Sequence, residues 1–319
     1  MKTFTFSLAP LQGITDHHFR NLFNMHFNGL DKVFTPFIRL QNDKTIKNSQ
    51  ILDIEPENNK EINIIPQILT NDVEEFIFLA KYLSGLGYSE INWNLGCPFP
   101  MLVKRQLGSG LLPFSDRIGE ILEKVLPVIS CKLSIKMRSG YENETDILKV
   151  IPNLNTFPLT EIIIHPRVGV QMYKGFANAS VVKKCMEICN HKLVYNGDIH
   201  DIESFQEIEK RLKTIESWMI GRAAISNPFI FEELKSGEKI PSAQKMERFS
   251  QFHFSLIDSY TESLSGTGHL LTKMLGFWEY FSLSFSNSKK VYKRIKKAHS
   301  IGQYNSAIHE IFNEEEFVG

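Results

Sequence analysis

The sequence predicts a (β/α)8 barrel, the TIM-barrel fold, followed by a small C-terminal all-helical domain. Eight short apolar runs alternate with helical patterns over about 235 residues, the count and length expected of such a barrel. The runs are nearly continuous, as in Ile162-Ile163-Ile164. This is typical of parallel strands that are buried on both faces. After a polar stretch at residues 235–244, strand patterns fade and only helical spacing remains.

The expected strands are residues 4–8, 32–37, 63–69, 90–95, 133–137, 161–165, 192–195 and 218–220. Helices are expected at residues 16–27, 72–84, 115–126, 146–154, 179–189, 202–212 and 228–234, with Asp16 as the first N-cap. Residues 41–61 are polar and predict a loop with local structure. Four more helices are expected at residues 246–264, 269–285, 289–299 and 305–312. We therefore expect a catalytic barrel at residues 1–240 and a helical domain at residues 241–319.

Composition narrows the function classes. The 319 residues include 36 Lys and Arg against 36 Asp and Glu, so the chain is not a globally basic nucleic-acid binder, although a local basic face stays open. The hydrophobic share of 42% excludes global disorder. Four cysteines in unsuitable spacing predict neither a disulfide framework nor a metal site. No apolar run suits a membrane span or a signal peptide, so we expect a cytoplasmic protein. We also expect it to be a monomer.

Polar side chains collect where the predicted strands end, which is where barrel enzymes place their active sites. They are Gln12, Gln67, Asn94, Lys136, Arg138, His165, Arg167, Asn196, Asp198 and Arg222. Each alone is ordinary, but together they would be costly to bury without a polar ligand.

The last two strand ends suggest a phosphate site. Asn196-Gly197-Asp198 and Gly221-Arg222 are short glycine-containing turns that enter helices, and barrels often bind phosphate there. The alternative is that the glycines only permit tight turns. A phosphate site together with Gln67 and Lys136 suits flavin mononucleotide, FMN, because the amide and amine would meet the polar edge of its ring.

Cys97 is the sharpest catalytic candidate, because it lies in a Gly-Cys-Pro turn at a strand end. A free thiol has a pKa of about 8.5, so at neutral pH it can act as a general acid. The alternative is a small buried core residue. The loop that follows includes Lys104, Arg105 and Gly108-Ser109-Gly110, and it is either a cover for a polyanionic substrate or an ordinary exposed loop.

Taken together, these stretches resemble the tRNA-dihydrouridine synthase family. The matching segments are residues 9–16, Asn94-Leu95-Gly96-Cys97-Pro98, residues 136–140, His165-Pro166-Arg167, residues 173–175, residues 196–199 and residues 219–224. Pro166, Val168 and Asn178 depart from the family pattern near the substrate side.

The resemblance implies an FMN-dependent reduction of uridine in RNA, most simply tRNA, to 5,6-dihydrouridine with NADPH as electron source. By this analogy reduced FMN gives hydride to C6 and Cys97 gives a proton to C5. The implied flavin contacts are Pro10, Leu11, Gln12, Gln67, Lys136, His165, Asn196, Gly197, Asp198, Gly221 and Arg222.

RNA would reach the barrel with its target base flipped out of the stack. The expected RNA contacts are Asn94, Lys104, Arg105, Arg138, Arg167, Lys289, Lys290, Lys293, Arg294 and Lys297. The last five belong to a basic helical face that would meet phosphates or simply be solvated, while the acidic residues Glu314, Glu315 and Glu316 predict a solvated tail. The alternatives are a dihydroorotate-type FMN barrel, a ribosomal-RNA enzyme, or an RNA-binding barrel without turnover.

Overall fold

A computed structural model describes residues 3–59 and 62–319, and these divide into two compact units. The first unit takes the N-terminal residues up to Pro10, Asp31–Ile199 and Gln206–Ile220. The second unit takes Leu11–Leu30, His200–Phe205 and Gly221–Gly319. Met1 and Lys2 of the start, and Lys60 and Glu61 of the expected loop at residues 41–61, lie outside the described residues. The assignment of residues 1–240 to catalysis and 241–319 to RNA binding stays a prediction.

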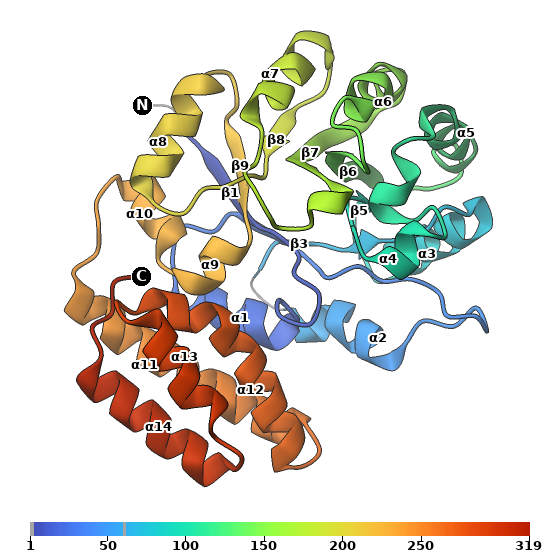
Figure 1. The fold of residues 1–319 in the computed structure, drawn as a ribbon. Helices are drawn as coiled ribbons and strands as arrows, with labels where there is room; N and C mark the ends of the chain where they lie inside the picture. Colours follow the sequence, from blue (N-terminus) through green and yellow to red (C-terminus); the bar gives the residue numbers. More distant parts are fainter. Residues whose placement is uncertain (1–2, 60–61) are drawn as a thin grey trace. The chain divides into compact units, whose positions relative to one another are not determined.

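The first unit is built on one parallel sheet that rolls into a nearly closed barrel (Figure 1). Its strands are β1 (Thr5–Leu8), β2 (Lys32–Phe34), β3 (Ile64–Ile65), β4 (Gln67–Ile68), β5 (Glu90–Leu95), β6 (Lys132–Gly140), β7 (Leu159–Val168), β8 (Leu193–Tyr195) and β9 (Ser217–Ile220). Their order is β3-β2-β1-β9-β8-β7-β6-β5-β4. The predicted barrel class is confirmed.

The third predicted strand, residues 63–69, is split by Pro66 into β3 and β4. The two halves pair with different neighbours, since Ile64 lies beside Val33 of β2 and Gln67 beside Asn92 of β5. Pro66 has no N–H for a ladder, but its carbonyl accepts a hydrogen bond of 2.8 Å from the backbone N–H of Asn92. One segment therefore occupies the third barrel position and brings Gln67 against β5.

The barrel interior has an apolar side and a polar side. The apolar side is a buried cluster contributed by strands or strand ends around most of the barrel, namely Ala9, Phe34, Ile65, Ile163, Val194 and Met219. The polar side comes from neighbouring strands β4, β5 and β6, where Gln67, Asn92 and Ser134 are fully buried. Such buried polar groups are stable only when they are hydrogen-bonded, so their partners determine the arrangement.

Helices of the first unit lie around the outside of this sheet (Figure 1). They are α2 (Asn48–Ile54), α3 (Val73–Gly85), α4 (Pro100–Val103), α5 (Ser115–Val125), α6 (Asp146–Leu154) and α7 (Ala179–Ile188), with 3-10 turns η1 (Pro56–Asn58), η2 (Gly108–Leu111) and η3 (Gly169–Gln171). Helix α8 (Ile202–Arg211) crosses the division between the units. Asp72 caps α3 through a 2.9 Å bond from the Glu75 N–H. The predictions missed α4, η2 and η3, which are too short to show a period.

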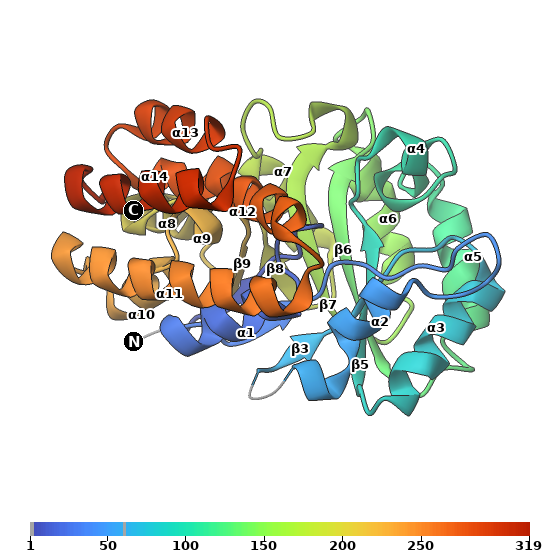
Figure 2. The same cartoon turned by 90° about the horizontal axis from the view of Figure 1, so that it is seen from below.

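The second unit is all-helical, and its helices α11 to α14 lie together in Figure 2. It contains α1 (His17–His26), α9 (Arg222–Ser226), α10 (Ile230–Ser236), α11 (Ser242–Ser263), α12 (Thr267–Phe281), η4 (Ser282–Ser284), α13 (Ser288–Lys296) and α14 (Ile301–Glu314). Asp16 caps α1 as predicted. Phenylalanine rings fill the core; for example, Phe19 stacks on Phe277 with ring centres 5.6 Å apart. In the part of the chain that the structure describes, no helix combines the length and apolar character of a membrane span.

A buried ion pair links α10 to α11 within the second unit. Lys245 Nζ lies 2.8 Å from Glu233 Oε1, and the two side chains are only 7% and 4% exposed. The same carboxylate also accepts hydrogen bonds from the Ile240 N–H at 3.0 Å and the Asn227 amide at 3.2 Å. A buried charge that loses its partner is strongly destabilising.

We predict that Lys245→Met lowers the free energy of unfolding by about 3–5 kcal/mol, because Glu233 is left charged and buried. Urea unfolding measures this. Lys239→Met is the matched control, since Lys239 pairs with Glu203 at the surface and should change little. Adding Glu233→Leu to Lys245→Met should recover part of the loss, and equal effects of the two lysine changes would contradict the assignment.

Candidate active site at the barrel mouth

The turn that carries Cys97 is held by side chains from three directions. Asn94 Oδ1 accepts hydrogen bonds of 2.9 Å from the backbone N–H groups of both Gly96 and Cys97. The backbone N–H and the Oγ of Ser109 donate to the Cys97 carbonyl at 3.0 and 3.1 Å. Arg138 Nε donates to the Gly96 carbonyl at 3.0 Å. The backbone of the turn is therefore tied to β5, to β6 and to η2.

A chain of amides continues from this turn into the barrel. Asn94 Nδ2 donates to Gln67 Oε1 at 2.6 Å, and Gln67 Nε2 donates to Asn92 Oδ1 at 2.7 Å. Asn92 Nδ2 in turn donates to Ser134 Oγ at 3.0 Å. Asn92, Ser134 and Ser109 were not among the predicted site residues, although Ser109 lies in the loop described after Cys97. The two-residue period of a strand could have found Asn92, because it puts Asn92 on the same face as Asn94.

The Cys97 side chain packs against an apolar cluster of Leu69, Leu102 and Leu107. This burial raises the pKa of the thiol, and the opposing contributions of the Phe99 N–H and of the Arg138 and Lys136 charges are smaller. At neutral pH the sulfur therefore carries its proton. A protonated thiol that also lies near two cations can release a proton and leave a stabilised thiolate.

Lys136 lies on β6 directly beside Asn94 of β5, so the two side chains share the inner face of the sheet. Burial, and then the charge of Arg138, lower the pKa of Lys136 to about 7, although Cys97 acts in the opposite direction. Among the described residues the Lys136 amine has no hydrogen bond or ion pair. A buried amine of this kind is satisfied by a bound acceptor group.

Arg138, a predicted RNA contact, is only 2% exposed. Besides the Gly96 carbonyl it donates to the Val168 carbonyl at 3.0 Å, and its guanidinium lies 5.6 Å from the Tyr173 ring centre. The position of Arg138 at a strand end led us to predict a contact with RNA. In the structure its guanidinium contacts the Gly96 and Val168 carbonyls and the Tyr173 ring.

Arg167, another predicted RNA contact, forms a two-pronged ion pair with Asp198. Its Nη1 and Nη2 atoms donate to the Asp198 oxygens at 2.9 and 2.7 Å, and further bonds reach the carbonyls of Lys174 and Gly175. Nη1 also lies 3.3 Å from His165 Nε2. Because a guanidinium can only donate, this contact makes Nε2 the acceptor and leaves the ring proton on Nδ1.

The predicted flavin residues at the end of β8 are positioned by close packing. Asn196 Nδ2 donates to the Met219 carbonyl at 2.8 Å, which ties β8 to β9. A Cβ at Gly197 would come within 2.1 Å of Tyr195 Oη, so only glycine fits there. Pro10 follows β1, where the N–H of its neighbour Ala9 bonds to the Ile220 carbonyl at 2.8 Å.

Four predicted flavin residues belong to the second unit. Leu11 and Gln12 begin a turn in which the Leu11 N–H donates to Thr15 Oγ1 at 2.8 Å. Gly221 precedes the short helix α9 and Arg222 begins it. Their role in binding phosphate or flavin stays a prediction.

The predicted basic residues of the second unit fall into two groups. Lys290 pairs with Glu315 at 2.6 Å, and Arg294 pairs with Glu314 at 3.1 Å and Glu310 at 3.5 Å. Lys289, Lys293 and Lys297 are exposed. The expectation of a solvated acidic tail is wrong for Glu315, whose side chain is 6% exposed in its ion pair. Lys104 and Arg105 of the first unit are also exposed.

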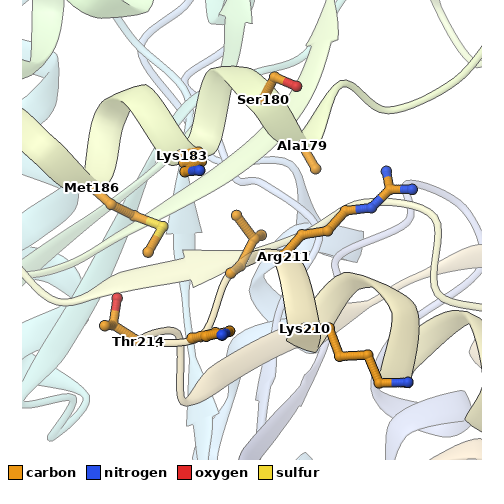
Figure 3. Close-up of a pocket in the computed structure, with 9 residues that line it drawn as sticks. Ala179, Ser180, Lys183, Met186, Lys210, Arg211 and Thr214 are labelled. Carbon is orange, nitrogen blue, oxygen red and sulfur yellow. The ribbon is translucent and has the colours of Figure 1, made fainter.

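A cavity of about 650 Å³ lies between α7 and the end of α8 in the first unit (Figure 3). Lys183, Lys210 and Arg211 border it, and none of its lining residues is a predicted site residue. No cluster of metal-ligating side chains occurs within residues 3–59 and 62–319.

Comparison with known families identifies the chain. A family model described as dihydrouridine synthase matches residues 7–313. The chain belongs to the dihydrouridine synthase family. Among its relatives, the tRNA-dihydrouridine synthase B of Vibrio vulnificus is 28% identical, with 73% of each chain covered. That of Pseudomonas aeruginosa is 27% identical over 74% of this chain and 71% of the relative. The predicted family and enzyme class are confirmed.

Solved structures show the same fold at low identity. The old yellow enzyme of Trypanosoma cruzi has a TM-score of 0.54 and 11% identity, covering 74% of this chain and 89% of that one. The histamine dehydrogenase of Rhizobium sp. 4-9 has a TM-score of 0.53 and 11% identity, covering 77% of this chain and 48% of that one. Both likenesses support the barrel assignment.

We predict that Gly108→Ala destabilises the protein and speeds the reaction of Cys97 with a disulfide reagent. An added Cβ would lie 2.5 Å from the Cys97 carbonyl oxygen, and Gly108 has a φ of +58°, so η2 must move away from the thiol. Urea unfolding and the rate of thiol labelling measure the two effects. Gly119→Ala is the control, because a Cβ there meets nothing within 4 Å inside α5. Unchanged labelling in Gly108→Ala would refute the contact.

Proposed function

We propose that the protein reduces a uridine of tRNA to 5,6-dihydrouridine, with bound FMN as cofactor and NADPH as electron donor. The observation that supports this most directly is that a protonated, tightly held Cys97 interacts electrostatically with the amine of Lys136, which has no hydrogen-bond partner among the described residues. The family relationship supports the reaction class. The names of the relatives support tRNA as the substrate.

The residues of the first unit fit a flavin. Lys136 offers a donor, and Gln67 keeps one amide hydrogen and one oxygen lone pair beyond its bonds to Asn92 and Asn94. We assign His165, Asn196, Gly197, Asp198 and Pro10 to the same site. The flavin roles of Leu11, Gln12, Gly221 and Arg222, which belong to the second unit, stay predictions. The flavin, when bound and reduced, supplies the hydride that the uracil ring takes at C6.

Cys97 supplies the matching proton. Its Sγ–H donates to C5 of the uracil as the C5–C6 double bond is reduced, so one hydride and one proton are added. Arg138 and Lys136 stabilise the thiolate that remains, because their positive charges lower its pKa. Solvent then restores the thiol. Burial keeps the sulfur protonated before the base arrives.

Arg138 and Arg167 act in this proposal as positioning residues. Arg138 holds the Gly96 carbonyl next to Cys97, and Arg167 holds His165 and Asp198 together. RNA binding is assigned instead to Lys104, Arg105 and the exposed lysines Lys289, Lys293 and Lys297. We keep Asn94, which has one amide hydrogen left beyond its bonds to Gly96, Cys97 and Gln67, as a proposed contact to the target base.

The function itself is tested with the purified protein, NADPH, FMN and total RNA from a strain that lacks this chain, with tRNA and ribosomal RNA separated after the reaction. We predict that the wild type forms dihydrouridine, mapped by mass spectrometry, and that Cys97→Ala loses at least about a hundredfold in rate, because the acid is gone. Flavin reduction by NADPH should survive in that variant. Dihydrouridine formation at the full rate by Cys97→Ala would refute the acid role, and product in ribosomal RNA alone would refute the tRNA assignment.

A second prediction concerns Lys136. A flavin oxygen accepts best from the ammonium form, and this lysine loses its proton near pH 7. Affinity for FMN should therefore be full below pH 7 and fall by up to about tenfold per pH unit above it, since binding must take up a proton. Fluorescence titration from pH 6 to 9 measures this. Lys136→Gln should bind more weakly at low pH and show a flat profile, whereas a sloping profile in that variant would contradict the assignment.

A third prediction concerns α13. Lys289, Lys293 and Lys297 are spaced by four along the helix and its C-cap, and within the described residues they have no ion-pair partner. Reversing all three to Glu should weaken tRNA binding by at least about tenfold and flatten its salt dependence. Filter binding at several salt concentrations measures both. The thermal unfolding midpoint should stay unchanged, and an unaltered dissociation constant would exclude this face.

A further inference from the structure

A groove of about 310 Å³ lies in the first unit beside the Cys97 loop. Residues of three segments line it, for example Arg39 after β2, Asn71 after β4 and Arg105 after β5. These segments all leave the carboxyl ends of their strands, so the groove opens on the same edge of the barrel as Cys97. We call it the Arg39–Arg105 groove.

The groove and Cys97 share a wall. Leu69 and Leu107 line the groove and also belong to the apolar cluster against which the Cys97 side chain packs. Asn71 Nδ2 donates to the carbonyls of Arg105 and Gln106 at 2.9 and 3.1 Å. The same loop continues to Ser109, which bonds to the Cys97 carbonyl. A ligand in the groove therefore contacts the segment that holds the thiol.

The groove has a surplus of free positive charge. Arg39, Lys44 and Arg105 line it, and none of them has an ion pair among the described residues. Its two carboxylates keep their charge but accept hydrogen bonds from other groups, because Asp72 caps α3 and Glu75 accepts a 2.9 Å hydrogen bond from Thr70 Oγ1. The three cations exceed the two carboxylates by one charge, so the groove favours an anion.

Amide groups complete the lining. Gln41 and Asn42 line the groove together with the three cations. Guanidinium groups bind phosphate with two parallel hydrogen bonds, and side-chain amides read the edges of bases. The volume lies at the low end of the range for ligand sites, about 300–1,000 Å³, which suits one nucleotide rather than a helix of RNA.

We propose that the Arg39–Arg105 groove binds the nucleotide next to the target uridine in the RNA substrate. The inference rests on the proposed function. When the target base is flipped toward Cys97, its neighbour loses a stacking partner, and base-flipping enzymes select their substrates partly through contacts to the flanking nucleotides. Binding the neighbour here would seat the uridine over the thiol and make the enzyme selective for flanking sequence.

The test uses the FMN-loaded full chain and an unmodified tRNA transcript carrying the uridine that mass mapping identifies. A second transcript has an abasic nucleotide on each side of that uridine. For the wild type, we expect the abasic changes to lower kcat/KM about tenfold. Arg39→Gln/Arg105→Gln should lower it at least about tenfold on the intact transcript, and the abasic changes should then cost this variant little more.

Lys183→Gln/Lys210→Gln is the matched control, because it removes two charges from the cavity between α7 and α8 shown in Figure 3. It should behave like the wild type. Equal losses in both double variants would mean general charge attraction and overturn the proposal. Full activity of Arg39→Gln/Arg105→Gln would also overturn the proposal. The same holds if the effects of the double variant and of the abasic changes are additive, or if the double variant raises the KM for NADPH and leaves the kinetics with RNA unchanged.

Failure of the proposed function can be told apart from failure of the groove proposal, because in the first case the wild type would form no dihydrouridine in any RNA. The groove would still be decided by the dissociation constant for unmodified tRNA, a measurement that needs no identified uridine. Loss of tRNA affinity in Arg39→Gln/Arg105→Gln but not in the control would support it. Equal affinities in all three proteins would overturn it.

Discussion

The hydrogen bonds of the Gly96–Cys97 turn are the constraint on which the rest of the site depends. Asn94, Ser109 and Arg138 satisfy the backbone groups of this turn, and each comes from a different element. Because the amide of Asn94 is itself held by Gln67, the position of Cys97 is linked to the strand segment that closes the barrel. Fold and site are thus joined by a few buried polar contacts, and each of these is costly to leave unsatisfied.

The separation of the barrel interior into an apolar and a polar side explains the pKa shifts of Lys136 and Cys97. The apolar residues on one side exclude water, and the polar residues on the other side concentrate near Lys136 and Cys97. The same burial acts in opposite directions on the two groups. It lowers the pKa of the lysine and raises that of the thiol, so an amine poised near neutrality stands beside a fully protonated acid. This pairing suits an enzyme that must hold a polar cofactor and deliver a proton in one place.

Sequence patterns predicted the barrel and the tail helices because these depend on local periodicity. One unusual turn singled out Cys97, whose catalytic role stays a prediction. The break at Pro66 was missed, although a proline inside a strand signals such an event. The roles of Arg138 and Arg167 could not be read from the sequence, since the Val168 carbonyl lies on the neighbouring strand β7 and Asp198 lies in the segment after β8. For the same reason the pairing of Lys290 with Glu315 was not foreseen: spacing along one helix says nothing about the carboxylates of the next.

Asn92 offers the most direct test of the central claim, that the buried amide chain positions Cys97. Among the described residues, the hydrogen bonds of the Asn92 side chain lead to the turn through Gln67 and Asn94. Stopped-flow measurement of flavin oxidation by tRNA in pre-reduced Asn92→Ala should show a maximal rate about tenfold to a hundredfold below that of the wild type, because small misplacements of a reacting group are costly. The half-saturating tRNA concentration and the rate of flavin reduction by NADPH should stay unchanged. Oxidation at the wild-type rate would contradict the account.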